Sequence, residues 1–109
     1  MALTRAFKDT VQARLQHDAA FRRELLRESV ECLVTGDLPT GKALLRDYIN
    51  ATVGFEALGG ALRKSPKSLM RMLSPSGNPR ARNLVDVLVY LQQAERLAFT
   101  VTARRRRAA

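Results

Sequence analysis

The chain has 109 residues, of which 46% are hydrophobic, enough for one compact domain with a modest core and too few for two. It carries 19 Lys and Arg against 10 Asp and Glu, a net charge of +9. One cysteine and one histidine provide neither an internal disulfide nor a zinc site, and no apolar N-terminal run resembles a signal peptide or membrane span. We therefore expect a cytoplasmic protein. Because no phosphate loop, nucleophile elbow or HExxH pattern occurs, we also expect no enzymatic activity, metal or cofactor.

The positive charge is concentrated in the second half of the chain. Residues 1–53 hold eight Lys and Arg against seven Asp and Glu, whereas residues 54–109 hold eleven against three. The terminal run Arg104 to Arg107 supplies four of those cations, and the second half stays basic without it. A localised positive field favours a polyanion because each neutralised phosphate releases counterions. Nucleic acid is therefore the leading partner, and a solvated basic surface that only aids solubility is the alternative.

Apolar spacing predicts two helices at the start of the chain. Over residues 4–16 apolar side chains recur at every fourth position, and a second helix runs from the N-cap Asp18 to Gly36. Cys32 lies among the apolar positions of the second helix, so we expect it to pack rather than to react. The positions expected on the two buried faces are Leu3, Phe7, Val11, Leu15, Phe21, Leu25, Leu26, Val30, Leu33 and Val34.

A third helix is predicted over residues 40–52. Asp37 and Thr40 can cap its first turn, and Gly54 can adopt the left-handed conformation that ends a helix. Its apolar face consists of Leu44, Leu45, Tyr48, Ile49 and Thr52.

The fourth predicted helix, residues 55–62, is short and contains two glycines. Leu58 and Leu62 lie four positions apart and share one face. Gly59 and Gly60 weaken it, since a glycine costs roughly 1 kcal/mol relative to alanine in a helix interior. We therefore expect another backbone to approach closely at these glycines.

A fifth helix, over residues 66–73, follows a bend at Arg63 and Lys64. Ser65 can cap it and Pro66 fits its first turn. The inward side chains are then Leu69, Met72 and Leu73, and the outward ones are Lys67, Ser68, Met70 and Arg71. Two short helices with a tight bend, the second presenting cations, have the anatomy of a helix-turn-helix whose second helix enters the major groove of DNA. An ordinary helical hairpin with a basic exposed face is the alternative.

The loop "SPSGNPRAR" separates this helix from the last one, expected over residues 81–96. Two prolines and a glycine force the chain out of helix, and Asn78 before Pro79 favours a turn. Arg80 and Arg82 follow, where they can reach flanking phosphates or remain solvated. The buried positions of the last helix are Leu84, Val87, Leu88 and Leu91.

Residues 97–102 alternate apolar with small or polar side chains, which predicts a short strand. A single strand needs a partner, so it pairs with its copy in a second subunit or with a partner's sheet edge, or the helix simply continues. We expect the run Arg104 to Arg107 to be a disordered tail that binds phosphate groups, with a tail that is only solvated as the alternative.

Two long segments carry a family resemblance. "GFEALGGALRKSPKSLMRMLSPSGNPRARNLVDVLVYL" resembles the Cro/repressor-type helix-turn-helix of the addiction-module antidote proteins, the host-inhibition-of-growth antitoxin class. "HDAAFRRELLRESVECLVTGDLPTGKALLRDYINATVGF" resembles the N-terminal helical region of that family. The resemblance implies an all-α fold of about five helices. Its parts are an N-terminal helical region at 1–36, a helix-turn-helix region at 37–96, and a short strand or basic tail at 97–109.

The resemblance also implies roles for single residues. Ser65 caps the recognition helix, Ser68 binds phosphate, and Gly59 takes the place of a small alanine between the crossing helices. Arg63 departs from the family pattern, because that turn position often holds glycine. Base-facing positions fall on Pro66, Lys67 and Arg71. The full set of expected DNA-binding residues is Ser65, Pro66, Lys67, Ser68, Met70, Arg71, Asn78, Arg80 and Arg82.

From these features we expect a sequence-specific transcriptional regulator that binds double-stranded DNA as a homodimer at the nucleoid. The resemblance adds the role of antitoxin, which neutralises a cognate toxin protein and regulates its own operon. Three alternatives remain at this point. They are a free-standing repressor without a toxin, an interaction protein that neutralises a ribonuclease toxin with little DNA binding, and an RNA-binding accessory protein, since positive charge does not distinguish the nucleic acids.

Overall fold

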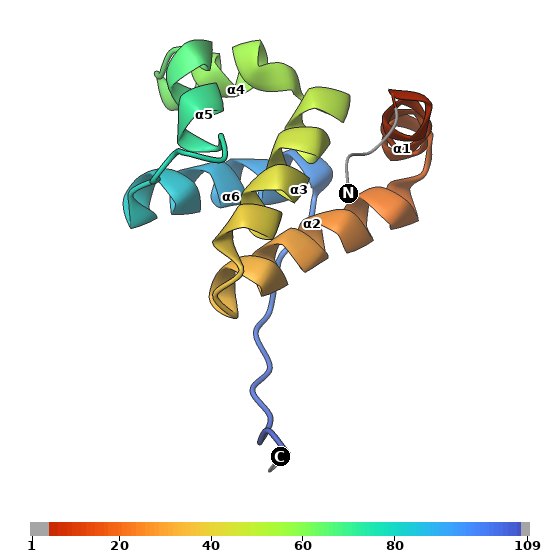
Figure 1. The fold of residues 1–109 in the computed structure, drawn as a ribbon, viewed down its shortest axis with the longest axis vertical. Helices are drawn as coiled ribbons and strands as arrows, with labels where there is room; N and C mark the ends of the chain where they lie inside the picture. The colour runs from red at the N-terminus through yellow and green to blue at the C-terminus, as the bar shows by residue number, and fades with distance from the viewer. Residues whose placement is uncertain (1–4, 108–109) are drawn as a thin grey trace.

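A computed structural model describes residues 5–107, which form six helices and no strand (Figure 1). The helices are α1 (Arg5–His17), α2 (Ala19–Val34), α3 (Leu38–Ala51), α4 (Gly54–Leu62), α5 (Pro66–Met72) and α6 (Ala81–Glu95). The all-α prediction is confirmed for this part of the chain. These six helices correspond one to one to the six ranges predicted from apolar spacing, one more than the overall expectation of about five. The extended backbone of Asp18 separates α1 from α2 as predicted.

Capping side chains set the start of α2 and α3. Asp18 accepts a hydrogen bond of 3.0 Å from the Phe21 amide, and this bond lowers the pKa of the Asp18 carboxyl. Asp37 accepts one of 3.3 Å from the Thr40 amide. Asp37 is thus the cap of α3, and the helix begins at Leu38, two residues before the predicted start.

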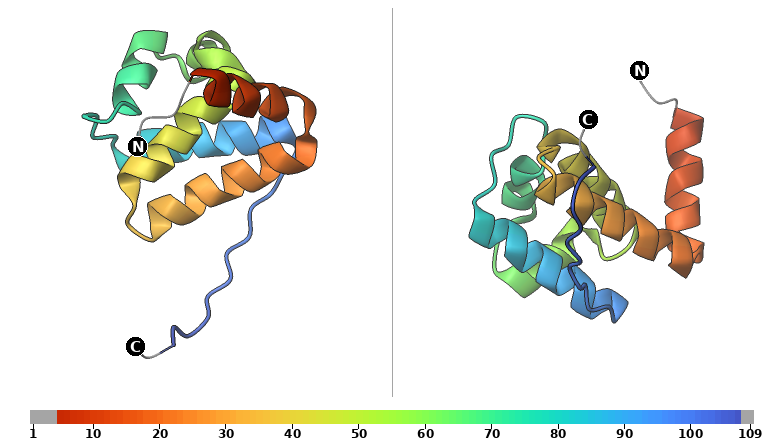
Figure 2. Two further views of the ribbon diagram at one scale, coloured as in Figure 1. Left: turned by 45° about the vertical axis from the view of Figure 1, so that its right-hand side comes forward. Right: turned by 90° about the horizontal axis from the view of Figure 1, so that it is seen from below.

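Helix α3 lies at the centre of the molecule, in contact with α1, α2 and α4, while α4 also packs on α5 and α6 (Figures 1 and 2). All six helices contribute to one core, because each carries apolar side chains at helical spacing. The buried hydrophobic residues are Leu15, Leu26, Leu45, Tyr48, Ile49, Ala51, Phe55, Leu58, Leu69, Leu73, Val87 and Leu91. The core therefore joins α4 to α3, α5 and α6.

Two apolar side chains that were expected to face inward do not. Phe7 is 53% exposed and Val34 is 76% exposed. Residues 6–10 of α1 are all exposed, and burial on this helix begins at Val11. Val34 ends α2, at the point where the chain turns towards α3. Leu3 and Thr4, also assigned to the first helix, lie outside the described residues.

The strand predicted at residues 97–102 does not form, and the chain runs there as an extended segment without secondary structure. Leu97 and Phe99 are partly buried against the core, and the Phe99 amide donates a 2.9 Å hydrogen bond to Gln92 Oε1. Packing on the helices thus accounts for Leu97 and Phe99, whereas Val101 is 93% exposed. Among residues 5–107, no helix has the length and apolar character needed to cross a membrane.

Candidate nucleic-acid interface

The turn between α4 and α5 depends on one residue in a left-handed conformation. Arg63 has φ 57° and ψ 44°, and the Lys64 amide donates a 3.0 Å hydrogen bond to the carbonyl of Gly59. Arg63 thus adopts a left-handed backbone that glycine would adopt without strain, at a cost of about 1 kcal/mol. The tight bend expected between the two helices is present without glycine at this position.

The two glycines of α4 differ in their surroundings. A Cβ atom built on Gly59 would lie 2.5 Å from the carbonyl oxygen of Lys64 and 3.4 Å from the nitrogen of Pro66. The predicted close approach of another backbone is therefore confirmed at Gly59. It is wrong at Gly60, where a Cβ would meet nothing within 4 Å.

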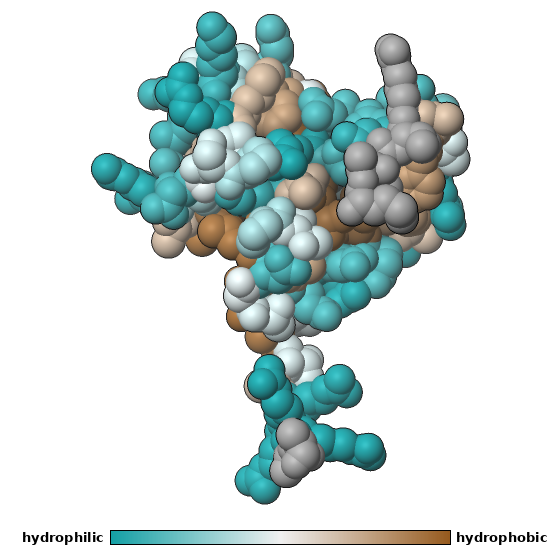
Figure 3. All heavy atoms as spheres, in the orientation of Figure 1, coloured by the Kyte–Doolittle hydropathy of each residue, from teal (hydrophilic) through white to brown (hydrophobic). Residues whose placement is uncertain are grey.

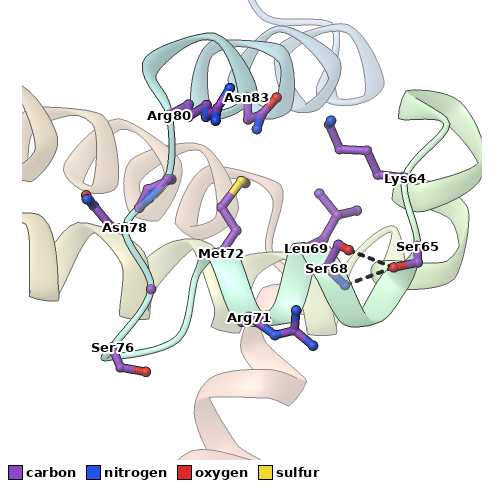
Figure 4. Close-up of a pocket in the computed structure, with 12 residues that line it drawn as sticks. Lys64, Ser65, Ser68, Leu69, Arg71, Met72, Ser76, Asn78, Arg80 and Asn83 are labelled. Atoms are coloured by element: carbon purple, nitrogen blue, oxygen red, sulfur yellow. Dashed lines mark hydrogen bonds between the residues drawn. The ribbon is translucent and has the colours of Figure 1, made fainter.

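Helix α5 begins at a hydroxyl cap. Ser65 has extended backbone, and its Oγ accepts a 3.0 Å hydrogen bond from the Ser68 amide. The Ser65 hydroxyl donates to Ser68 Oγ at 2.9 Å, so the proton of the exposed Ser68 hydroxyl can point to solvent (Figure 4). The capping role expected of Ser65 is thus seen in the structure.

The two faces of α5 separate as the sequence predicted. Leu69 and Leu73 are fully buried and Met72 is partly buried. The exposed side chains are Lys67, Ser68, Met70 and Arg71. Pro66 differs from its expected base-facing role, because it is partly buried and lies beside Gly59 of α4.

An open groove of about 590 Å³ lies between α5, the loop that follows it and the start of α6. Lys64 of the turn, Arg71 of α5 and Arg80 at the N-cap position of α6 are among its lining residues. Lys64 and Arg80 lie on the α6 side of α5, and Arg71 projects from the other edge of this helix (Figure 4). No Asp or Glu lines this groove. Its lining residues are Lys64, Ser65, Ser68, Leu69, Arg71, Met72, Ser76, Gly77, Asn78, Pro79, Arg80 and Asn83.

Five of the nine expected DNA-binding residues meet at this groove: Ser65, Ser68, Arg71, Asn78 and Arg80. Lys67, Met70 and Arg82 are exposed on α5 or α6 outside its lining. Sequence reasoning missed Lys64, Ser76 and Asn83. Asn83 follows Arg80 by three residues, a spacing that places both on one side of a helix start and is the signal that was available.

The arginine tail leaves the molecule far from this groove. Residues 101–107 are exposed, and the chain extends away from the helices on the side opposite α4 and α5 (Figures 1 and 2). In the space-filling view, hydrophilic side chains project over α4 and α5 and again along the tail (Figure 3). The two basic surfaces are therefore separate.

The described residues bring together no group of three or more His, Cys, Asp or Glu that could hold a metal ion. Cys32 is partly buried, and desolvation together with the nearby carboxylates of Asp37, Glu28 and Glu31 raises the pKa of its thiol. A thiol with a raised pKa is a poor nucleophile, which agrees with a packing role.

Comparison with known proteins gives no relative: no family model matches the chain, and no curated protein or solved structure is significantly similar to it.

Proposed function

We propose that this chain is a sequence-specific DNA-binding transcriptional regulator in which α4, the turn and α5 act as a helix-turn-helix. The observation that carries the proposal is the groove, which Lys64, Arg71 and Arg80 line from three elements and which no Asp or Glu lines. Cations on either side of an exposed helix can neutralise the phosphates that border a DNA groove. An ordinary helical hairpin would not require cations from three different elements along one groove.

In this proposal α5 reads bases. An α-helix with its side chains is about 10–12 Å across, which fits a major groove about 12 Å wide, and the seven residues of α5 make about two turns. Arg71 is exposed and its guanidinium can donate two parallel hydrogen bonds to guanine O6 and N7. Lys67, one turn earlier, can contact a neighbouring base edge, and the hydroxyl of Ser68 can donate to a phosphate.

The loop and the start of α6 supply phosphate contacts in the same proposal. Arg80 stands at the N-cap position of α6 and Arg82 is exposed two residues later. The side-chain amides of Asn78 and Asn83 line the groove beside them and can donate to phosphate or to base edges. These contacts would fix the register of α5 along the duplex.

The homodimer is also a proposal. Residues 97–107 form no strand that could pair with a second copy in this structure. Helix α6 instead exposes Val85 (54%) and Val89 (44%), which lie four residues apart on one face. A second copy packed there would place two recognition helices for two half-sites of an operator.

The antitoxin role rests on the sequence resemblance alone. It predicts that the chain co-purifies with a small protein encoded beside it and suppresses the toxicity of that protein. A free-standing repressor would bind an operator and have no such neighbour.

The test of DNA reading is a selection from a pool of random duplexes, followed by titration of the enriched and a scrambled duplex in the same salt. We expect enrichment of one short motif, and binding to it about a thousandfold or more tighter than to the scrambled duplex, which is the lower end for specific binders. Equal affinity for all duplexes, or preference for single-stranded RNA, would contradict the proposal.

A further inference from the structure

Lys42 of α3 is a buried cation whose side chain ends inside the loop that follows α5. It is 3% exposed. Its Nζ donates hydrogen bonds to the carbonyl oxygens of Ser74 (2.9 Å), Pro75 (3.3 Å) and Gly77 (2.7 Å). An ammonium group has three protons to donate, and three carbonyls accept them here. Burying a cation is unfavourable unless it is bonded in this way, so the loop carbonyls and Lys42 hold one another in place.

Arg46, one turn further along α3, holds the end of α5. Its guanidinium NH1 donates to the carbonyl of Leu73, the C-cap residue of α5. The last carbonyls of a helix have no partner within it and carry partial negative charge, which favours a cation beside them. Two consecutive turns of α3 therefore fix the C-terminal end of α5 and the loop after it.

The loop is also folded closely against α5 at Gly77. A Cβ built there would lie 2.2 Å from the carbonyl oxygen of Arg71 and 2.4 Å from that of Met72. The Gly77 amide donates a 2.9 Å hydrogen bond to the Ser74 carbonyl, and its own carbonyl accepts from Lys42. Residue 77 is thus held between α5 and α3. Arg80 follows three residues later, so the position of Gly77 helps to set the position of Arg80.

We propose that Lys42 and Arg46 are positioning residues for DNA reading, which act by holding α5 and residues 74–77 so that Arg71 and Arg80 line one groove. This inference rests on the proposed function of the groove. Lys42 is buried and does not line the groove, so it has no direct path to a phosphate. Its effect on DNA passes through the loop carbonyls.

The test compares Lys42→Met, which keeps the length of the side chain and removes its charge, with Lys42→Arg and with Lys8→Met as a control on an exposed lysine of α1. In the free protein, Lys42→Met should speed hydrogen exchange of the Ser74 and Gly77 amides, which donate to Arg71 and Ser74 carbonyls, about tenfold or more, with α1 unchanged. On DNA, the ratio of affinities for preferred and scrambled duplexes should fall roughly tenfold. Lys42→Arg, which keeps the positive charge, should show smaller changes in both measurements than Lys42→Met. Lys8→Met should change neither.

The salt dependence separates positioning from direct contact. If Lys42 acts through the loop, Lys42→Met leaves the slope of log affinity against log salt unchanged. A slope reduced by about one would mean that Lys42 itself neutralises a phosphate, and would overturn the proposal. An unchanged affinity ratio and unchanged loop exchange in a folded variant would overturn it too.

A second variant covers the case in which Lys42→Met does not fold, as judged by its circular dichroism. Arg46→Gln removes one bond to the Leu73 carbonyl, and should change loop exchange and the affinity ratio in the same direction by a smaller factor. No change in either measurement would overturn the proposal. Wild-type protein that binds no duplex would contradict the proposed function instead, while exchange in the free protein would still decide whether Lys42 holds the loop.

Discussion

Arg22 and Glu95, which are 73 positions apart in the chain, form a bidentate ion pair that joins α2 to the end of α6. The guanidinium Nε and NH2 of Arg22 lie 2.9 and 3.1 Å from the two carboxylate oxygens. Tyr48 of α3 donates its hydroxyl proton to the same carboxylate at 2.5 Å. Both charged side chains are only 16–20% exposed, so the pair is shielded from solvent. Three helices thus meet at one carboxylate.

The ion pair predicts that stability falls in acid. The bond from Arg22, followed by that from Tyr48, holds the pKa of Glu95 below the ordinary glutamate value of 4.5. The unfolded chain then binds this proton more readily than the folded one, so the stabilisation is present above about pH 4.5 and is lost as the pH falls through the folded-state pKa. Glu95→Gln should lower the free energy of unfolding by about 1–3 kcal/mol at pH 7, because Arg22 loses its partner.

Urea unfolding of wild type and Glu95→Gln at pH 7 and pH 3 measures this difference. We expect the difference in stability between the two proteins to be smaller at pH 3 than at pH 7. A gap of the same size at both pH values would show that the carboxylate charge is not what stabilises the junction. Glu24→Gln is the control, because the Glu24 side chain pairs with Arg27 and is 61% exposed. This substitution should change stability much less.

The paired glycines of α4 predict opposite effects of one substitution. Gly59→Ala places a methyl group against the Lys64 carbonyl and should destabilise the protein by about 1–3 kcal/mol. Gly60→Ala meets open space and should stabilise it by roughly 0.5–1 kcal/mol, because alanine loses less backbone entropy in a helix. Chemical unfolding of both variants is the measurement. Equal effects at the two positions would mean that α5 does not approach α4 at Gly59.

Removal of the arginine tail should weaken DNA binding without loss of discrimination. Residues 104–107 are exposed and lie far from α5, so the tail can add only contacts with phosphate. For about six phosphate contacts in the intact protein, affinity should fall about a thousandfold between 50 and 200 mM salt. Truncation after Ala103 should reduce this slope and weaken preferred and scrambled duplexes by the same factor. Binding that does not respond to salt would contradict the electrostatic part of the proposal.

The dimer proposal predicts that Val89→Glu yields a monomer. A carboxylate placed beside Val85 on the exposed face of α6 would have to be desolvated in a second-copy interface. Sedimentation velocity at tens of micromolar, with and without the preferred duplex, should show a dimer for wild type and a monomer for the variant. Wild-type protein that binds the preferred duplex as a monomer would contradict the dimer proposal.

Local signals in the sequence predicted the helices well. Asp18, Asp37 and Ser65 all cap helices in the structure, since a cap requires only a side chain and the next few amides. The inward and outward sides of α5 followed from spacing alone. The close approach at Gly59 was also foreseeable, because a glycine in a helix interior needs a reason.

Long-range contacts were beyond the reach of the sequence. Nothing local distinguishes the buried Lys42 from an exposed lysine, because its three acceptors come from a loop more than thirty positions away. The ion pair between Arg22 and Glu95 could not be predicted either, because the two residues are 73 positions apart in the chain. The alternating pattern at residues 97–102 predicted a strand, but Leu97 and Phe99 are partly buried against helices without one, and Val101 is exposed.

Arg71 gives the most direct test that α5 reads bases. Binding of wild type, Arg71→Ala and Arg23→Ala is titrated on the preferred and a scrambled duplex at one salt concentration. Arg23 is exposed on α2, far from the groove, and its substitution removes the same charge. We predict that Arg71→Ala loses about 1–3 kcal/mol on the preferred duplex and little on the scrambled one, while Arg23→Ala changes neither appreciably. If Arg71→Ala lowers both affinities by the same factor, α5 is not the recognition helix.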